Sequence, residues 1–139
     1  MYLIDVNALI ALVDPLHVHH EKVSYWFLNS HLEGWATCPI IENGFVRILG
    51  HLNYPNGSGS TDSTRELLIR LCMQPGHQFW PDSISIRKEY GSSLPLSKHL
   101  TDYYLLALAI SRNAKLATLD TRINPEMLYG GEGALLLIK

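Results

Sequence analysis

Four carboxylates stand in this sequence where apolar elements begin, end or present a buried face. They are Asp5, Glu42, Asp102 and Asp120. Asp5 closes the apolar run 2–4 and Asp120 closes the run 116–119, so both are expected at the carboxyl ends of buried strands. Removing an unpaired carboxylate from water costs several kcal/mol, and four carboxylates together would repel one another. A shared cation is the simplest explanation, and oxygen ligands favour a hard divalent ion, magnesium or manganese.

The other two acids lie on expected helices. Residues three, four, seven and eight positions after Asp102 are apolar: Leu105, Leu106, Ala109 and Ile110. Glu42 has the same relation to Phe45, Val46 and Leu49. These spacings place each carboxylate on the stripe of its helix that faces the core.

Each acid also has an ordinary explanation when it is taken alone. Asp5 could cap a helix, Asp102 could favour a helix amino terminus, and Asp120 could form a turn. Glu42 could be a solvated helix residue. The metal-site prediction depends on the convergence of all four at one edge of a sheet, where ligands collect in open α/β folds.

Two polar residues near the acids could support such a site. Asn7 could orient Asp5 or a water, or could simply begin a helix. Thr118 shares a strand face with Asp120 and could bond a water or phosphate, although a β-branched residue is also common in strands. Four basic residues flank the acids and could bind phosphate or be solvated: Arg47, Lys98, His99 and Arg122.

The histidines His17, His19 and His20 resemble a metal cluster at first sight. Their spacing fits neither a helical pair four residues apart nor ligands gathered by a turn, so a polar helix start is the better interpretation. The cysteines Cys38 and Cys72 stand in separate apolar contexts without metal-ligand spacing and are expected to be buried small residues.

Length and composition indicate one domain over residues 1–139. The chain is 47% hydrophobic, which is enough to fill a core. Its 11 Lys and Arg residues are scattered and the net charge is -2, which counts against a general nucleic-acid coating protein but not against an enzyme with bound metal. No apolar stretch reaches membrane-spanning length and no targeting segment precedes the first strand, so a cytoplasmic protein is expected.

Strand and helix patterns alternate, which is typical of a parallel sheet with helices on its faces. Strands are expected at 2–5, 35–38 and 115–120, with a short extended piece at 78–81 and an edge strand at 134–138. Helices are expected at 7–13, 18–32, 39–49, from about 64 to 71, and 100–113. The Asn, Gly and Ser residues within 53–63 predict a surface loop.

Metal ions held by such carboxylates could activate a water and hydrolyse a phosphodiester, as in a nuclease, but other interpretations remain open. A haloacid-dehalogenase-like phosphatase needs a second acid two residues after Asp5, and Asn7 stands there. A catalytically silent interaction module remains open, as does a housekeeping nuclease without a protein inhibitor. A metal-dependent change in stability would distinguish the silent module from either nuclease.

Four segments, taken in order, resemble PIN-domain ribonucleases and, more narrowly, VapC-type toxins of bacterial toxin–antitoxin pairs. They are 3–10 (LIDVNALI), 35–47 (WATCPIIENGFVR), 100–109 (LTDYYLLALA) and 116–120 (LATLD). The resemblance runs from the first expected strand to the last.

This resemblance implies a three-layer α/β/α fold with a central, mostly parallel sheet. It implies Asp5, Glu42, Asp102 and Asp120 as catalytic, metal-binding acids, with Asn7 and Thr118 in support. It also implies a magnesium-dependent endoribonuclease that forms a homodimer and is inhibited by an antitoxin whose tail covers the acidic pocket. Substrate-binding residues and the target RNA do not follow from it.

Overall fold

A central sheet of five strands organises the molecule, and the computed structural model describes residues 1–139 of it. The strands are β1 (Tyr2–Ile4), β2 (Trp35–Thr37), β3 (His77–Phe79), β4 (Lys115–Thr118) and β5 (Leu135–Leu137). Their order in the sheet is β3-β2-β1-β4-β5, and every neighbouring pair is parallel. The expected parallel α/β architecture is therefore confirmed.

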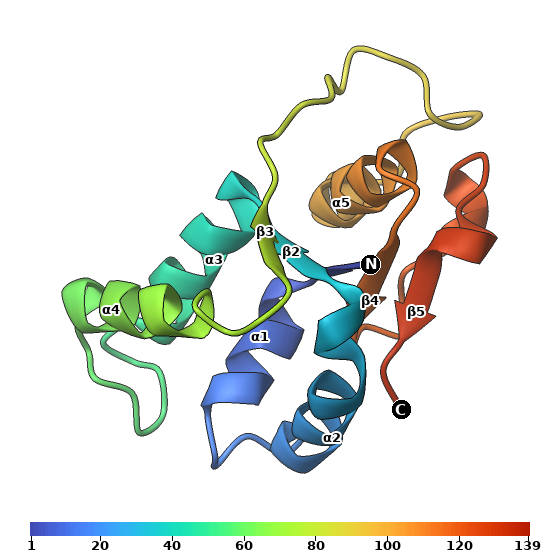
Figure 1. The fold of residues 1–139 in the computed structure, drawn as a ribbon. Helices are drawn as coiled ribbons and strands as arrows, with labels where there is room; N and C mark the ends of the chain where they lie inside the picture. Colours follow the sequence, from blue (N-terminus) through green and yellow to red (C-terminus); the bar gives the residue numbers. More distant parts are fainter.

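Five α-helices cover the sheet. They are α1 (Val6–Val13), α2 (His20–Ser30), α3 (Pro39–Leu49), α4 (Thr61–Leu71) and α5 (Leu100–Ser111). In Figure 1, α5 lies on one side of the sheet, whereas α1 and α2 lie on the other. The helices and sheet thus form the three expected layers, with α3 packed against both α1 and α4.

The core lies on both faces of the central strands. Leu3 of β1 and Leu116 of β4 are fully buried, as their continuous apolar runs predict for strands covered on two sides. The helix α5 has six buried residues and is apolar around most of its circumference, so it is a core helix rather than a surface one. This packing fixes the position of the first turn of α5, which carries Asp102.

Several element boundaries differ from the expected ones. The helix α4 begins at Thr61 rather than near residue 64, because Ser60 caps it by accepting a 3.2 Å hydrogen bond from the backbone N–H of Ser63. The helix α2 is shorter than the expected 18–32, and a 3₁₀ turn (His31–Glu33) follows it. The terminal strand β5 lies at a sheet edge, as expected.

The strand order reverses its direction between β1 and β4. From β1 the chain continues through α1 and α2 to β2 on one side and later reaches β4 on the other side. In open α/β sheets, a reversal of this kind opens a crevice at the carboxyl ends of the two strands. Asp5 and Asp120 follow β1 and β4 at this point.

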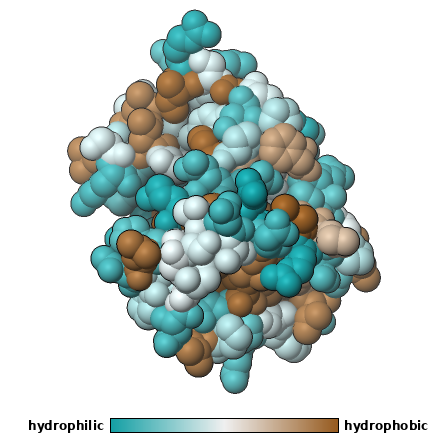
Figure 2. All heavy atoms as spheres, turned by 90° about the vertical axis from the view of Figure 1, so that its left-hand side faces the viewer, coloured by the Kyte–Doolittle hydropathy of each residue, from teal (hydrophilic) through white to brown (hydrophobic).

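Hydrophobic and hydrophilic residues are interspersed on the face shown in Figure 2, which is the left-hand side of Figure 1, where α4 lies. None of the helices has the length and apolar character needed to cross a membrane.

Candidate metal centre

Asp5 is held in place by backbone and side-chain donors. It is the cap of α1, and its Oδ1 accepts a 2.8 Å hydrogen bond from the backbone N–H of Val6. Only 7% of the residue is exposed. Burial raises the pKa of this carboxyl, and the nearby charge of Asp120 raises it further, while the hydrogen bonds from Thr118 and Val6 oppose the shift. Asp5 therefore caps the helix and also presents a second oxygen at the crevice.

Thr118 connects the two strand ends. Its Oγ1 donates a 2.8 Å hydrogen bond to Oδ2 of Asp5 and accepts one of 3.0 Å from the backbone N–H of Asp120. The residue is completely buried. The Thr118 hydroxyl therefore orients the Asp5 carboxylate itself.

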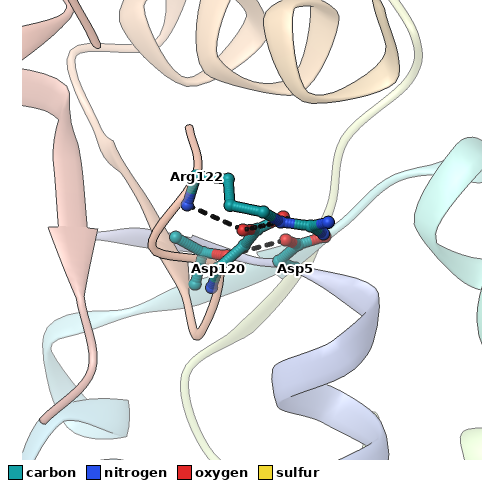
Figure 3. Close-up of polar contacts among 4 residues, drawn as sticks. Asp5, Asp120 and Arg122 are labelled. Atoms are coloured by element: carbon teal, nitrogen blue, oxygen red, sulfur yellow. Dashed lines mark hydrogen bonds and ion pairs between the residues drawn. The ribbon is translucent and has the colours of Figure 1, made fainter. Parts of the chain in front are cut away.

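Asp120 forms an ion pair with Arg122, as Figure 3 shows. The guanidinium reaches both carboxylate oxygens, at 3.0 Å from Nε to Oδ1 and 3.1 Å from Nη2 to Oδ2. The Arg122 hydrogen bond holds the pKa of Asp120 below its usual value, although burial acts in the opposite direction. Asp120 is thus ionised and has a cationic partner that is itself largely exposed.

Asp102 joins Asp5 and Asp120 from α5, which lies on the other side of the sheet from α1. It lies in the first turn of α5 and is half-buried. Burial raises the pKa of its carboxyl to about 6, and the charges of Asp5 and Asp120 add to the shift. Arg122 and His99 lower it in part. The charges of Asp5 and Asp120 thus act on Asp102, so the three carboxyls influence one another at this edge of the sheet.

The surroundings of this site include some of the residues singled out from sequence. A shallow hollow beside Asp120 and Arg122 is lined by Asn7, His17 and His19. Asn7 is exposed on the first turn of α1 and has no recorded hydrogen bond to Asp5. The three histidines do not form a group of metal ligands. The first residue of α2, His20, bonds the carbonyl of Ala11 through Nδ1 at 2.7 Å.

Glu42 has different neighbours from the three aspartates. It lies in the first turn of α3, and its Oε2 accepts a 2.7 Å hydrogen bond from Oγ1 of Thr37. The same threonine oxygen lies 2.8 Å from Nε2 of His77. The ligand atoms of Glu42, Cys72 and His77 all lie within 4.8 Å of one another. The structure therefore brings Asp5, Asp102 and Asp120 together electrostatically but places the Glu42 carboxylate in a neighbouring cluster.

Burial shifts the pKa of both Cys72 and His77 in this cluster. The pKa of the Cys72 thiol is raised to about 11 by burial and by the charge of Glu42, against the effect of Thr37. Burial lowers the pKa of His77, although Glu42 opposes the shift. No sequence pattern indicates this cluster, because its members come from α3, the residue after α4 and β3 at unrelated spacings.

The donor set of the three aspartates fits a hard divalent cation. Carboxylate oxygens are the ligands that magnesium and manganese accept. The charge of Asp120 raises the pKa of Asp5, and the charges of Asp5 and Asp120 raise the pKa of Asp102. Only one guanidinium, that of Arg122, forms an ion pair with them. A divalent ion would neutralise charges that are otherwise left in repulsion.

This fold and its acidic edge match a known protein class. A family model of the PIN domain matches residues 2–124, so the chain belongs to the PIN-domain family. The resemblance noted from the four sequence segments is thereby confirmed.

Particular members of that family are similar over most of their length. Ribonuclease VapC44 of Mycobacterium tuberculosis is 39% identical over 124 residues, which cover 87% of each chain. Ribonuclease VapC38 of the same organism is 37% identical over 124 residues, covering 88% of this chain and 87% of the relative. A solved structure of FitAB bound to an IR36 DNA fragment has a TM-score of 0.63 at 19% identity, covers 99% of this chain and 94% of that one, and shows the same fold.

Proposed function

We propose that this protein is a magnesium-dependent endoribonuclease that serves as the toxin of a toxin–antitoxin pair. The main support for this proposal is the group of Asp5, Asp102 and Asp120, which lies where the strand order reverses in a PIN-domain fold. The similarity to proteins named ribonucleases VapC44 and VapC38 supports RNA as the substrate.

The three aspartates would hold the magnesium ion, or manganese in its place, and Glu42 would be the fourth acid. When bound, such an ion supplies Lewis-acid chemistry: it lowers the pKa of water and stabilises negative charge on phosphate oxygens. Thr118 fixes the orientation of Asp5, and the backbone N–H of Val6 holds the other Asp5 oxygen. No side-chain nucleophile is needed for hydrolysis of a phosphodiester by this chemistry.

Arg122 would have a separate role at the same edge. Its guanidinium is largely exposed and lies against Asp120 beside the open hollow lined by Asn7 and His17. A planar guanidinium binds phosphate oxygens well. We propose that it also guides the RNA backbone toward the aspartates.

The direct test is cleavage of structured RNA by the purified protein, with magnesium and with chelator. Asp5→Asn and Asp120→Asn are expected to abolish magnesium-dependent cleavage, because each loses a charged ligand. Asp62→Asn is the matched control, since Asp62 lies on α4 and forms only an exposed ion pair with Arg65. Cleavage that persists in chelator, or in both active-site variants, would exclude the proposal.

The place of Glu42 can be tested in the same assay. If Glu42 turns toward the aspartates when the ion binds, Glu42→Gln should lower the rate of cleavage at saturating RNA and weaken magnesium binding. Glu126→Gln is a suitable control, because Glu126 lies in a 3₁₀ turn outside both clusters. Equal magnesium affinity and cleavage in Glu42→Gln and the unmodified protein would remove Glu42 from the site.

The toxin role implies a protein inhibitor. We propose an antitoxin that covers the acidic crevice, and a homodimer. Co-expression of this chain with the product of an adjacent short reading frame should yield a stable complex without RNA cleavage. Recovery of an active, uncomplexed nuclease in that experiment would instead favour a housekeeping enzyme.

A further inference from the structure

The cluster around Glu42 offers a second and chemically different set of ligands. It combines a carboxylate from α3, the thiol of Cys72 directly after α4, and an imidazole from the first residue of β3. The three ligand atoms lie within 4.8 Å of one another, and all three residues are half-buried. Unlike the aspartate site, this cluster contains sulfur and nitrogen.

The cluster is held in place by contacts outside it. Thr37, at the end of β2, donates to Glu42 at 2.7 Å and has its Oγ1 2.8 Å from Nε2 of His77. The His77 ring packs on the fully buried Trp35, with 4.6 Å between ring centroids. Partners that fix an imidazole and a carboxylate in this way are typical of the residues that surround metal ligands.

The ligand chemistry selects the ion. Thiolate and imidazole favour zinc-like, borderline-soft metals, whereas magnesium prefers oxygen alone. Tetrahedral zinc with bonds of about 2.0–2.3 Å places its ligands about 3.5 Å apart, so closing the present arrangement needs movements on the order of 1 Å. Three protein ligands leave the fourth position for water.

We propose that Glu42, Cys72 and His77 form a zinc site that regulates the nuclease. Binding forms a bond between Sγ of Cys72 and the metal and releases the thiol proton to solvent. Zinc there holds the Glu42 carboxylate on Thr37 and His77, away from the three aspartates. This regulatory part rests on the proposed function, in which Glu42 is the fourth acid of the magnesium site; the zinc site itself does not.

Cobalt binding tests the site without any activity measurement. Titration of the reduced, metal-free protein with Co²⁺ is expected to produce a thiolate-to-cobalt charge-transfer band that saturates at one equivalent. Cys72→Ser should abolish the band, and His77→Gln should weaken binding about tenfold or more. Cys38→Ala is the matched control, because Cys38 is the other free cysteine and is buried outside the cluster.

Zinc inhibition tests the regulatory part. One equivalent of Zn²⁺ added to a magnesium-dependent RNA cleavage assay should slow the unmodified protein and Cys38→Ala about tenfold. For each variant, the cleavage rate with zinc is divided by its own rate without zinc. This ratio should be near one for Cys72→Ser. Circular dichroism and thermal unfolding of each variant verify that it is folded.

These outcomes distinguish the zinc site, its regulatory effect and the proposed nuclease function from one another. Absence of a charge-transfer band, or a band that survives Cys72→Ser, overturns the zinc site. Equal zinc inhibition of the unmodified protein and Cys72→Ser overturns the regulation, since the ion would then act at the aspartates. A cobalt band in a protein that cleaves no RNA under any condition supports the zinc site and contradicts the proposed nuclease function.

Discussion

The Thr118 hydroxyl joins two of the three aspartates through one atom. It donates to Asp5 and accepts from the backbone of Asp120. Thr118→Val keeps the shape of the side chain but leaves the buried Asp5 carboxylate and the half-buried Asp120 N–H without that partner. We expect a loss of about 1–3 kcal/mol in the free energy of unfolding, measured by urea denaturation in chelator.

Thr121→Val provides the matched comparison. Thr121 is exposed, follows Asp120 directly and has no recorded side-chain hydrogen bond. Its substitution should change the free energy of unfolding by less than about 0.5 kcal/mol. Equal losses in the two variants would show that the Thr118 bonds do not stabilise the fold.

Asp102 makes stability depend on pH in a defined direction. Its pKa is about 6 in the fold, against an ordinary value of 3.8. Between these values the folded protein binds a proton that the unfolded chain has lost, so stability falls as pH rises through this window. Below it, both states are protonated and Asp102 has no such effect.

Asp102→Asn should therefore stabilise the metal-free protein above about pH 6. The carboxyl is half-buried, so solvent screening reduces the expected gain to on the order of 1 kcal/mol. The gain should vanish near pH 4. Urea denaturation of both proteins in chelator, from about pH 4 to pH 7, measures it. A gain that is constant across this range would contradict the shifted pKa.

Arg122 competes with any cation for the charge of Asp120. Arg122→Gln removes the ion pair, and we expect magnesium to bind about threefold more tightly, as for the loss of an exposed pair. Isothermal titration calorimetry measures the affinity. Arg65→Gln is the control: it removes another exposed ion pair, on α4, and should leave magnesium affinity unchanged. If Arg122→Gln instead binds magnesium more weakly, Arg122 contributes to the metal site.

Sequence periodicity predicts the aspartates as site residues because each one ends or begins a strongly apolar element. Asp5 and Asp120 follow buried strands, and the core-facing spacing of α5 locates Asp102. The same reasoning could not locate the partners of Glu42. Its contacts with His77 and Cys72 arise where β3 and the end of α4 meet α3, and no local pattern encodes which side chains meet there.

At the scale of elements, α4 shows how a single cap sets a boundary. The polar residues 60–63 predicted a loop, but Ser60 bonds the N–H of Ser63 and starts the helix at Thr61. Ser60→Ala should lower the free energy of unfolding by about 1 kcal/mol, measured by thermal or urea unfolding. Ser63 is exposed in the first turn of α4. Ser63→Ala should therefore leave the free energy of unfolding nearly unchanged or raise it slightly.

Strand identity was easier to predict than strand order. Apolar runs and turn residues indicated β1, β2, β4 and the edge strand β5 within one or two residues of their observed bounds. The reversal of order between β1 and β4 depends on which helices pack on which face. That choice is made by tertiary packing, so the crevice follows from it and not from any single segment.

For the whole molecule, metal binding should increase the free energy of unfolding. An ion that binds only the folded protein adds roughly 2.7 kcal/mol at about 100 times its dissociation constant. Magnesium should therefore raise the unfolding temperature, and chelator should reverse the change. Asp5→Asn should respond much less, whereas Asp62→Asn should respond like the unmodified protein. An equal magnesium response in all three proteins would place the ion elsewhere.

The hydrogen bond from Thr118 to Asp5 spans 113 positions of the chain. Translation makes Asp5 well before Thr118, so a growing chain cannot assemble the acidic site until β4 has left the ribosome. Incomplete translation products therefore carry Asp5 without its partners. A protein that cuts RNA would be harmless to the message and the ribosome that are making it until β4 has emerged.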